Sequence, residues 1–299
     1  MGLPHDPRAR YARIFVRGIP EGDGQRAVGK RFRSAVTVYA YLVGAGFRRQ
    51  SHYKLAMFAG LFTNCVFGFV RASVLVAAVH AASDFGGYDQ GTIGAYVWLS
   101  QGLLGAVQFT GPLGELDDRV KNGDIAIDFL RPVDIQFCYL AEDLGRAACT
   151  FLPRGVPSVL VGALTFGLAM PATPGPYLLG MMSVLLAVAI SFLCRFAVAL
   201  VGFWVVETRG IRQLYYASAT FLAGLFVPVH MFPSWLRAIA EATPFPSVLQ
   251  SPVDVLSGRI TGAEAFSIVG VQVFWVLVTG VAGRVLLIAG RRRLEVQGG

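Results

Sequence analysis

Charged residues are scarce in this 299-residue chain. They make up 15% of it, whereas an average soluble domain has about 25%. Hydrophobic residues make up 55%, and the mean hydropathy is +0.57. This composition excludes an ordinary soluble domain and predicts an integral membrane protein. A net charge of +8 can indicate nucleic-acid binding, but the basic residues lie at the two ends and between alternate hydrophobic runs. We therefore expect no nucleic-acid partner.

Residues that carry metal, redox or catalytic chemistry are also few. The four cysteines are Cys65, Cys138, Cys149 and Cys194. They form no CxxC pair and have no nearby histidine, so we interpret them as small apolar packing residues. No GxSxG or HExxH motif occurs, and the hydrophobic runs contain no paired polar residues. We therefore expect that the chain is no enzyme and binds no metal or cofactor directly.

Acidic residues are absent from the hydrophobic runs before Glu241. A proton-driven carrier would need buried carboxylates inside its spans. The absence argues against such a carrier, so another subunit is expected to supply the energy for any transport.

The first 33 residues lack a hydrophobic run, which excludes a cleavable signal peptide. They are rich in Arg, Gly and Pro without periodicity, and we expect a basic, disordered cytoplasmic extension over residues 1–33. Within it, GQRAVGK matches the GxxxxGK spacing of a phosphate-binding loop. Arg31 occupies the position of the Mg²⁺-binding Ser or Thr, and no buried strand precedes the motif. ATP is therefore not expected to bind here.

Six hydrophobic segments follow that can cross a hydrocarbon core of about 30 Å. They cover residues 55–80, 96–113, 149–170, 177–204, 214–229 and 265–288. Residues 34–54 combine aromatic side chains with a basic end, which is typical of an elbow helix in the membrane interface. A longer, tilted first span is the alternative. The sequence thus predicts an all-α membrane protein with six transmembrane helices.

Lysine and arginine indicate the orientation of these spans. Eleven of the 26 precede Leu55, and three more form Arg291–Arg293. The predicted outer loops contain only Arg237 and Arg259. Because basic residues concentrate on the cytoplasmic side of membrane proteins, both termini are expected in the cytoplasm.

The longest interior stretch with charges throughout is LDDRVKNGDIAIDFLRPVDIQF, residues 116–137. Gly123 permits a turn, Asp124 is placed to cap a new helix, and Pro132 ends it after about two turns. The large apolar residues between them are Ile125, Ile127, Phe129 and Leu130, and Arg131 follows. Such a helix is too apolar for a solvated loop and too charged for lipid, so we expect it to contact a protein partner. A helix that lies on the lipid headgroups is the alternative.

Two arginines, Arg71 and Arg195, fall in the middle of predicted spans. A charge at that depth costs about 2.5–3.5 kcal/mol on insertion scales, so each needs a partner or a wet cavity. One hypothesis places them on a transport pathway, where they attract an anionic part of the substrate. The other gives them inter-helix hydrogen bonds to the backbone or to residues such as Asn64, Gln101 and Gln108.

Prolines interrupt the chain after the fifth predicted span. The residues that mark this segment are Pro228, Phe232, Pro233, Trp235, Pro244 and Phe245. We interpret it as short re-entrant helices that dip into the outer leaflet between spans 5 and 6. Irregular backbone at that depth requires surrounding protein or a water-filled cavity.

The order of these parts, with the segments GDIAIDFLRPVD, FVPVHMFPSWL and the terminal VQGG, resembles the permease subunit of ABC-2 type transporters. The resemblance covers residues 34–299 and implies one transmembrane domain there. It also implies that residues 123–134 form a coupling helix that fits a cleft in a separate ATPase subunit, and that the outer helices guard the exit. Residues 1–33 depart from the compact start of the family, and nothing is implied for them.

The resemblance further implies that the chain is half of a permease. A second copy or a homologous permease and two ATPase subunits, which would bind ATP and Mg²⁺, would complete an exporter in the bacterial inner membrane. The substrate class would be a drug, a lipid or a glycan-like molecule. A membrane channel, or a scaffold component without its own ATPase, is the alternative function.

Overall fold

The computed structural model describes residues 24–81, 86–111, 113, 115–131, 133–205 and 207–297, with the backbone alone at 24–35 and 295–297. Within these ranges every regular element is a helix, which confirms the all-helical prediction. Most of the predicted N-terminal extension, residues 1–23, lies outside the described residues, and so does Pro132.

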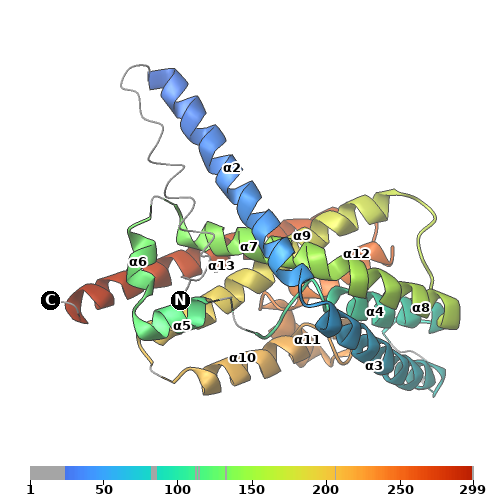
Figure 1. Cartoon of the computed structure of the whole chain (residues 1–299). Coiled ribbons are helices and arrows are strands. Elements are labelled where there is room, and N and C mark those ends of the chain that lie inside the picture. The colour runs from blue at the N-terminus through green and yellow to red at the C-terminus, as the bar shows by residue number, and fades with distance from the viewer. Residues whose placement is uncertain are drawn as a thin grey trace.

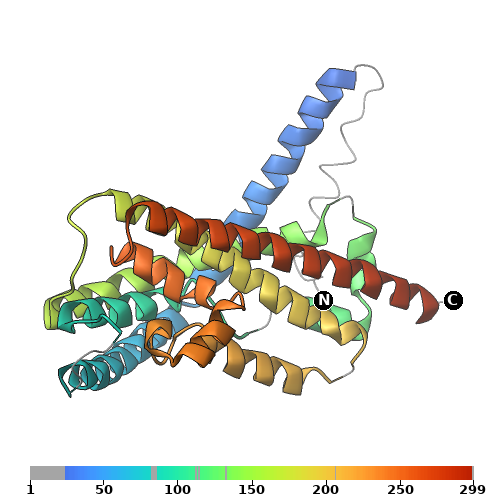
Figure 2. The same cartoon turned by 180° about the vertical axis from the view of Figure 1, so that it is seen from behind.

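Among the described residues, four helices are long and apolar enough to cross a membrane. They are α3 (Lys54–Ala81), the continuous run Ile135–Phe166, α9 (Gly175–Leu200) with the 3₁₀ turn η2 (Val201–Phe203), and α13 (Gly262–Gln297). They correspond to the first, third, fourth and sixth predicted spans. In its apolar stretch of 18 residues, α9 has 67% of the residues buried inside the protein, whereas α3 and α13 have 22% buried in theirs. Helix α9 is therefore central, and α13 runs alongside it in both views (Figures 1 and 2).

The helices at the second and fifth predicted spans are somewhat shorter than the predicted segments, which have 18 and 16 residues. Helices α4 (Gln90–Leu103) and α10 (Arg209–Leu222) have 14 residues each, about 21 Å at 1.5 Å per residue. Helix α4 nevertheless lies inside the bundle, since Trp98 and Ile93 are fully buried. It ends because the chain turns at Leu103, whose carbonyl accepts from the N–H groups of Ala106 and Val107. The described part of the chain thus contains four candidate membrane spans, and the six-span prediction is not confirmed.

The third span starts earlier than predicted and has three parts. Helix α7 (Ile135–Thr150) continues through a π-helical turn, η1 (Phe151–Gly155), into α8 (Val156–Phe166). Pro153 lies in the π-helical turn, where a wider winding accommodates a residue that cannot donate a backbone hydrogen bond. The chain leaves α8 at Gly167, which has a positive φ of 65°.

Helix α2 (Gly24–Ser51) begins ten residues before the predicted elbow helix. Its first half extends away from the bundle, whereas its second half crosses α7 (Figure 1). Val38 and Leu42 of α2 pack there against Cys138 and Ala141 of α7. A break at Tyr53 separates α2 from α3. The position of α2 in the membrane interface stays a prediction.

Glycine permits the close crossing of α2 and α7. A Cβ atom added to Gly46 would lie 2.0 Å from the carbonyl oxygen of Glu142. We expect Gly46→Ala to force the helices apart and to destabilise the protein by about 1–3 kcal/mol, as overpacking does. Gly44→Ala is the matched control, because its Cβ would meet only the Arg48 side chain at 3.5 Å. Thermal unfolding in detergent checks this prediction, and equal melting temperatures for both variants would contradict it.

Candidate functional site

Residues 115–131 form two short helices, which we call the corner. They are α5 (Leu116–Asn122) and α6 (Ile125–Phe129). Gly123 joins them with a φ of 82°, so the predicted turn is confirmed at a conformation that favours glycine. Helix α5 was not predicted. The capping prediction for Asp124 is wrong, because its side chain caps nothing, and the turn is closed instead by Ala126 N–H, which donates to the Gly123 carbonyl at 3.1 Å.

A buried carboxylate, Asp128, fastens the two helices of the corner together. Nη1 of Arg119 donates to both of its carboxylate oxygens at 2.7 Å, and Nη1 of Arg131 lies 3.3 Å from Oδ1. Asp128 is only 4% exposed. The two arginines offset the cost of burying this charge and hold the corner in one shape.

The apolar residues of the corner divide into inward and outward groups. Ile125 is fully buried and packs in the cluster that contains Leu116 and Phe196, so it anchors the corner and is not available to a partner. Ile127 and Leu130 point outward and are 53% and 85% exposed. We call these two residues the corner surface. Periodicity alone could not separate the groups, because α6 has little more than one turn.

Helix α13 links the corner to the short elements that follow α10, residues 228–256, which we call the outer segment after their predicted position. Three contacts lie near the corner. The guanidinium of Arg291 in α13 lies over the ring of Phe129. Arg284 of α13 forms an ion pair with Asp134, and the carbonyl of Gly280 accepts a hydrogen bond from Gln136. Near its other end, the buried side chain of Gln272 donates to the carbonyls of Ser183 and Ser247 at 3.1 and 2.9 Å. Ser247 belongs to the 3₁₀ turn η4 (Pro246–Val248) in the outer segment. One continuous helix therefore contacts both regions.

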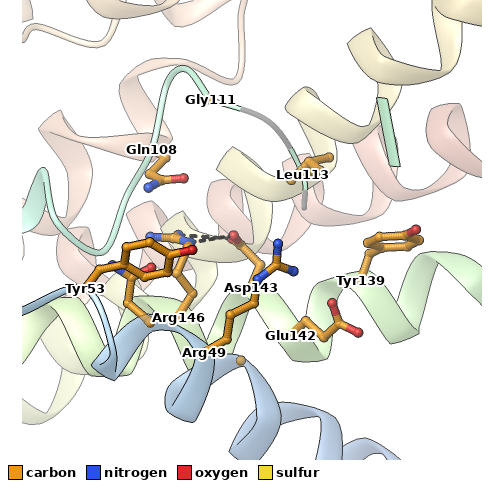
Figure 3. A pocket seen from close by; sticks show the side chains of 11 residues that line it. Arg49, Tyr53, Gln108, Gly111, Leu113, Tyr139, Glu142, Asp143 and Arg146 are labelled. Carbon is orange, nitrogen blue, oxygen red and sulfur yellow. Dashed lines mark hydrogen bonds and ion pairs between the residues drawn. The ribbon is translucent and has the colours of Figure 1, made fainter. Parts of the chain in front are cut away.

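A pocket of about 280 Å³ opens where α2 crosses α7 (Figure 3). Its walls are Gly46, Arg49, Gln50 and Tyr53 around the end of α2, Tyr139, Glu142, Asp143 and Arg146 of α7, and Gln108, Gly111 and Leu113 of the segment after α4. Eight of these eleven residues have polar side chains, in a chain that is otherwise largely apolar.

Asp143 on the pocket wall is held by two arginines. Nε of Arg146 donates to Oδ1 at 2.7 Å, and Nη2 of Arg195 donates to Oδ2 at 2.9 Å. Nη1 of Arg195 also donates to Oε1 of Gln108 at 3.2 Å. Arg195 therefore makes an inter-helix hydrogen bond to Gln108, as the second of the two hypotheses for the mid-span arginines predicted. It also makes an ion pair with Asp143 that the sequence analysis did not identify, because Asp143 lies before residue 149, where the third predicted span begins. A carboxylate is thus buried within a candidate span, which corrects the prediction that none lies there.

Arg71 lies in a different environment, between α3 and α4. Its Nη1 donates to Oγ of Ser100 at 3.3 Å, while Nε and Nη2 are buried and have no hydrogen-bond partner among the described residues. Arg154 of η1 reaches Oδ1 of Asn64 at 3.2 Å. The structure thus gives Arg71 and Arg195 different hydrogen-bond partners, and a pathway role for either residue stays a prediction.

The outer segment consists of short elements, as predicted. They are η3 (Val229–Met231), α11 (Ser234–Glu241), η4 and α12 (Gln250–Leu256). Pro228 and Pro233 directly precede η3 and α11. Phe232 stacks on Phe221 with ring centroids 5.3 Å apart, and Trp235 is 65% exposed. Pro244 and Phe245 lie just before η4. The depth of these helices in a membrane stays a prediction.

A network around buried Asp254 holds the outer segment, and the sequence analysis did not identify it. Nε2 of His230 lies 2.8 Å from Oδ2, and Nε2 of Gln250 donates to both carboxylate oxygens at 3.0 and 2.9 Å. Arg259 lies 3.5 Å from Asp254 and covers the ring of Tyr88 at 4.2 Å. Burial raises the pKa of Tyr88 above its ordinary value. The network ties η3 and α12 to the loop before α4.

The family comparison agrees with this architecture. A family model described as "ABC-2 family transporter protein" matches residues 65–298. No curated protein matches the chain. Members of this family are membrane components that work with ABC ATPase subunits and are not themselves catalytic. The chain therefore belongs to the ABC-2 transporter family, as the multi-pass membrane permease of an ABC transporter.

Proposed function

We propose that this chain is one permease half of an ATP-driven exporter in the bacterial inner membrane, with both termini in the cytoplasm. A second copy or a homologous permease and two ATPase subunits complete the transporter, and the ATPase subunits bind ATP and Mg²⁺. The substrate is a drug, a lipid or a glycan-like molecule. In this topology α4 and α10 are short second and fifth spans, α2 is the interfacial elbow helix and the outer segment is re-entrant.

The observation that carries this proposal is the shape of the corner. Two exposed apolar side chains, Ile127 and Leu130, stand on a short helix that Asp128 and buried Ile125 hold rigidly. Leu130 is 85% exposed, so its side chain gains almost no stabilisation from apolar burial within this chain. A cleft in a partner subunit would bury it. The charged residues around it suit a water-exposed interface better than lipid. We therefore assign the ATPase contact to Ile127 and Leu130, with Phe129 and Arg131 beside them.

Two routes lead from the corner into the bundle. The chain itself continues into α7, which carries Asp143 and therefore the ion pair with Arg195 of α9. The second route is α13, which contacts the corner at Phe129 and the outer segment at Ser247. A displacement of the corner by ATPase closure would thus reach both the centre of the bundle and its outer end.

Purification of the tagged chain from its native membrane in a mild detergent tests the proposal. Mass spectrometry should find an ABC ATPase bound to it, with vanadate-sensitive ATP hydrolysis in the sample. A second permease in the same sample would identify a heterodimer, and its absence a homodimer. If the chain purifies without an ATPase and conducts ions in a planar bilayer without ATP, the channel alternative replaces the proposal. An inert chain without an ATPase would favour the scaffold.

A further inference from the structure

The pocket between α2 and α7 contains hydrogen-bond donors that nothing in the described part of the chain uses. The side chains of Arg49, Gln50 and Tyr53 make no hydrogen bond or ion pair there, although all three line the pocket. They supply a guanidinium, an amide and a phenolic hydroxyl to the wall of one pocket. Figure 3 shows two of these residues, Arg49 and Tyr53. Free donors of this kind suit a ligand that is rich in oxygen acceptors.

The charges of the pocket favour an anion on the Arg49 side. Asp143 is already paired with Arg146 and with Arg195, so its negative charge is offset. Glu142 is the second carboxylate on the wall. The lining has two arginines, Arg49 and Arg146, and two carboxylates, so its charges balance, and Arg195, which pairs with Asp143 from outside the lining, adds one further positive charge. Arginine binds phosphate oxygens with a planar set of donors, which makes a phosphate group the best match.

The position of the pocket indicates where the phosphate comes from. Tyr53 lies directly before α3, and the first apolar residues of that helix, Leu55 and Phe58, are 84% and 70% exposed. An apolar surface that faces lipid thus begins immediately beside the pocket. In a membrane, this change from basic to apolar residues marks the layer of the lipid phosphates. An acyl chain attached to a phosphate in the pocket would lie along Leu55 and Phe58.

We propose that this pocket binds the phosphate of an anionic amphiphile from the cytoplasmic leaflet, with Arg49 as the main phosphate ligand and Gln50 and Tyr53 as additional donors. The assignment to the cytoplasmic leaflet rests on the topology of the proposed function. Binding itself requires no ATPase. A chain that binds the lipid but purifies without an ATPase would contradict the proposed function alone, and the reverse result would contradict this site alone.

The test titrates the purified chain in detergent with dihexanoyl phosphatidylglycerol at fixed ionic strength and follows binding by calorimetry. Arg49→Gln should raise the Kd about tenfold, and Tyr53→Phe about threefold, as expected for charged and neutral hydrogen bonds. Arg48→Gln is the matched control, because the Arg48 guanidinium lies over the ring of Tyr41 at 5.1 Å and outside the pocket. Its Kd should change by less than about twofold, as expected for an exposed charge.

Three results would overturn the proposal. Equal losses for Arg48→Gln and Arg49→Gln would indicate general surface electrostatics. An unchanged Kd for Arg49→Gln would exclude this pocket as the site. Inorganic phosphate that binds as tightly as the lipid would identify a site for a free anion and exclude a lipid ligand. Equal melting temperatures of the variants establish that each result reflects binding and not unfolding.

Discussion

Leu130→Asp should release the ATPase subunit and leave the permease folded. Leu130 is 85% exposed, so the substitution costs the isolated chain almost nothing. In the complex, a desolvated aspartate would face the cleft that the leucine fills. Loss of a central apolar anchor typically costs about 2 kcal/mol or more, which is about a thirtyfold loss in affinity. The ratio of ATPase to permease after co-purification measures the effect, with the melting temperature of the permease as the check on folding.

Three variants sharpen this experiment. Leu130→Met keeps the apolar surface and should retain the ATPase. Ile127→Asp should weaken binding by a similar route, because Ile127 is 53% exposed on the same corner surface. Ile125→Asp should instead unfold the corner, since that side chain is fully buried. Retention of the ATPase by Leu130→Asp at the wild-type ratio would refute the assignment of the corner surface.

Asp143→Ala should have the largest effect on stability of any single substitution considered, a loss of about 3–5 kcal/mol in the free energy of unfolding. The reason is that Asp143 is buried between Arg146 and Arg195, and its removal leaves the guanidinium of Arg195 buried without a counter-charge. The substitution leaves Arg146 better satisfied, because its Nη atoms also donate to the carbonyls of Gly105 and Ala106 at 3.1 and 2.9 Å. Thermal or denaturant unfolding in detergent measures the loss.

A double substitution separates the ion pair from the packing around it. Asp143→Leu with Arg195→Met removes both charges and should recover most of the stability that Asp143→Ala loses, because a buried ion pair can be replaced by apolar residues at little cost. Asp124→Ala is the control on an exposed aspartate without a capping role, and it should change stability by less than about 0.5 kcal/mol. A double variant as unstable as Asp143→Ala would show that the ion pair is not the cause.

The sequence by itself determined the class of the protein and the approximate position of its long helices. Hydrophobic runs of 20 or more residues leave few alternatives to membrane spans, because the backbone of such a segment must satisfy its hydrogen bonds internally in lipid. The predicted spans 55–80 and 265–288 fall within α3 and α13. The turn at Gly123 was predictable for a local reason, since glycine is favoured at positive φ.

Only the tertiary structure decided which residues face each other. Asp143 and Arg195 are 52 positions apart, and His230 and Asp254 are 24 apart. Periodicity indicates which face of a helix is apolar but not which polar group from another helix lies opposite a charge. The length of α4 was also decided by the tertiary structure, since the hydrophobic run continues past Leu103 while the chain turns there to pack inside the bundle. In the same way, packing against α5 and α9 buries Ile125 and leaves Leu130 exposed, which periodicity did not show.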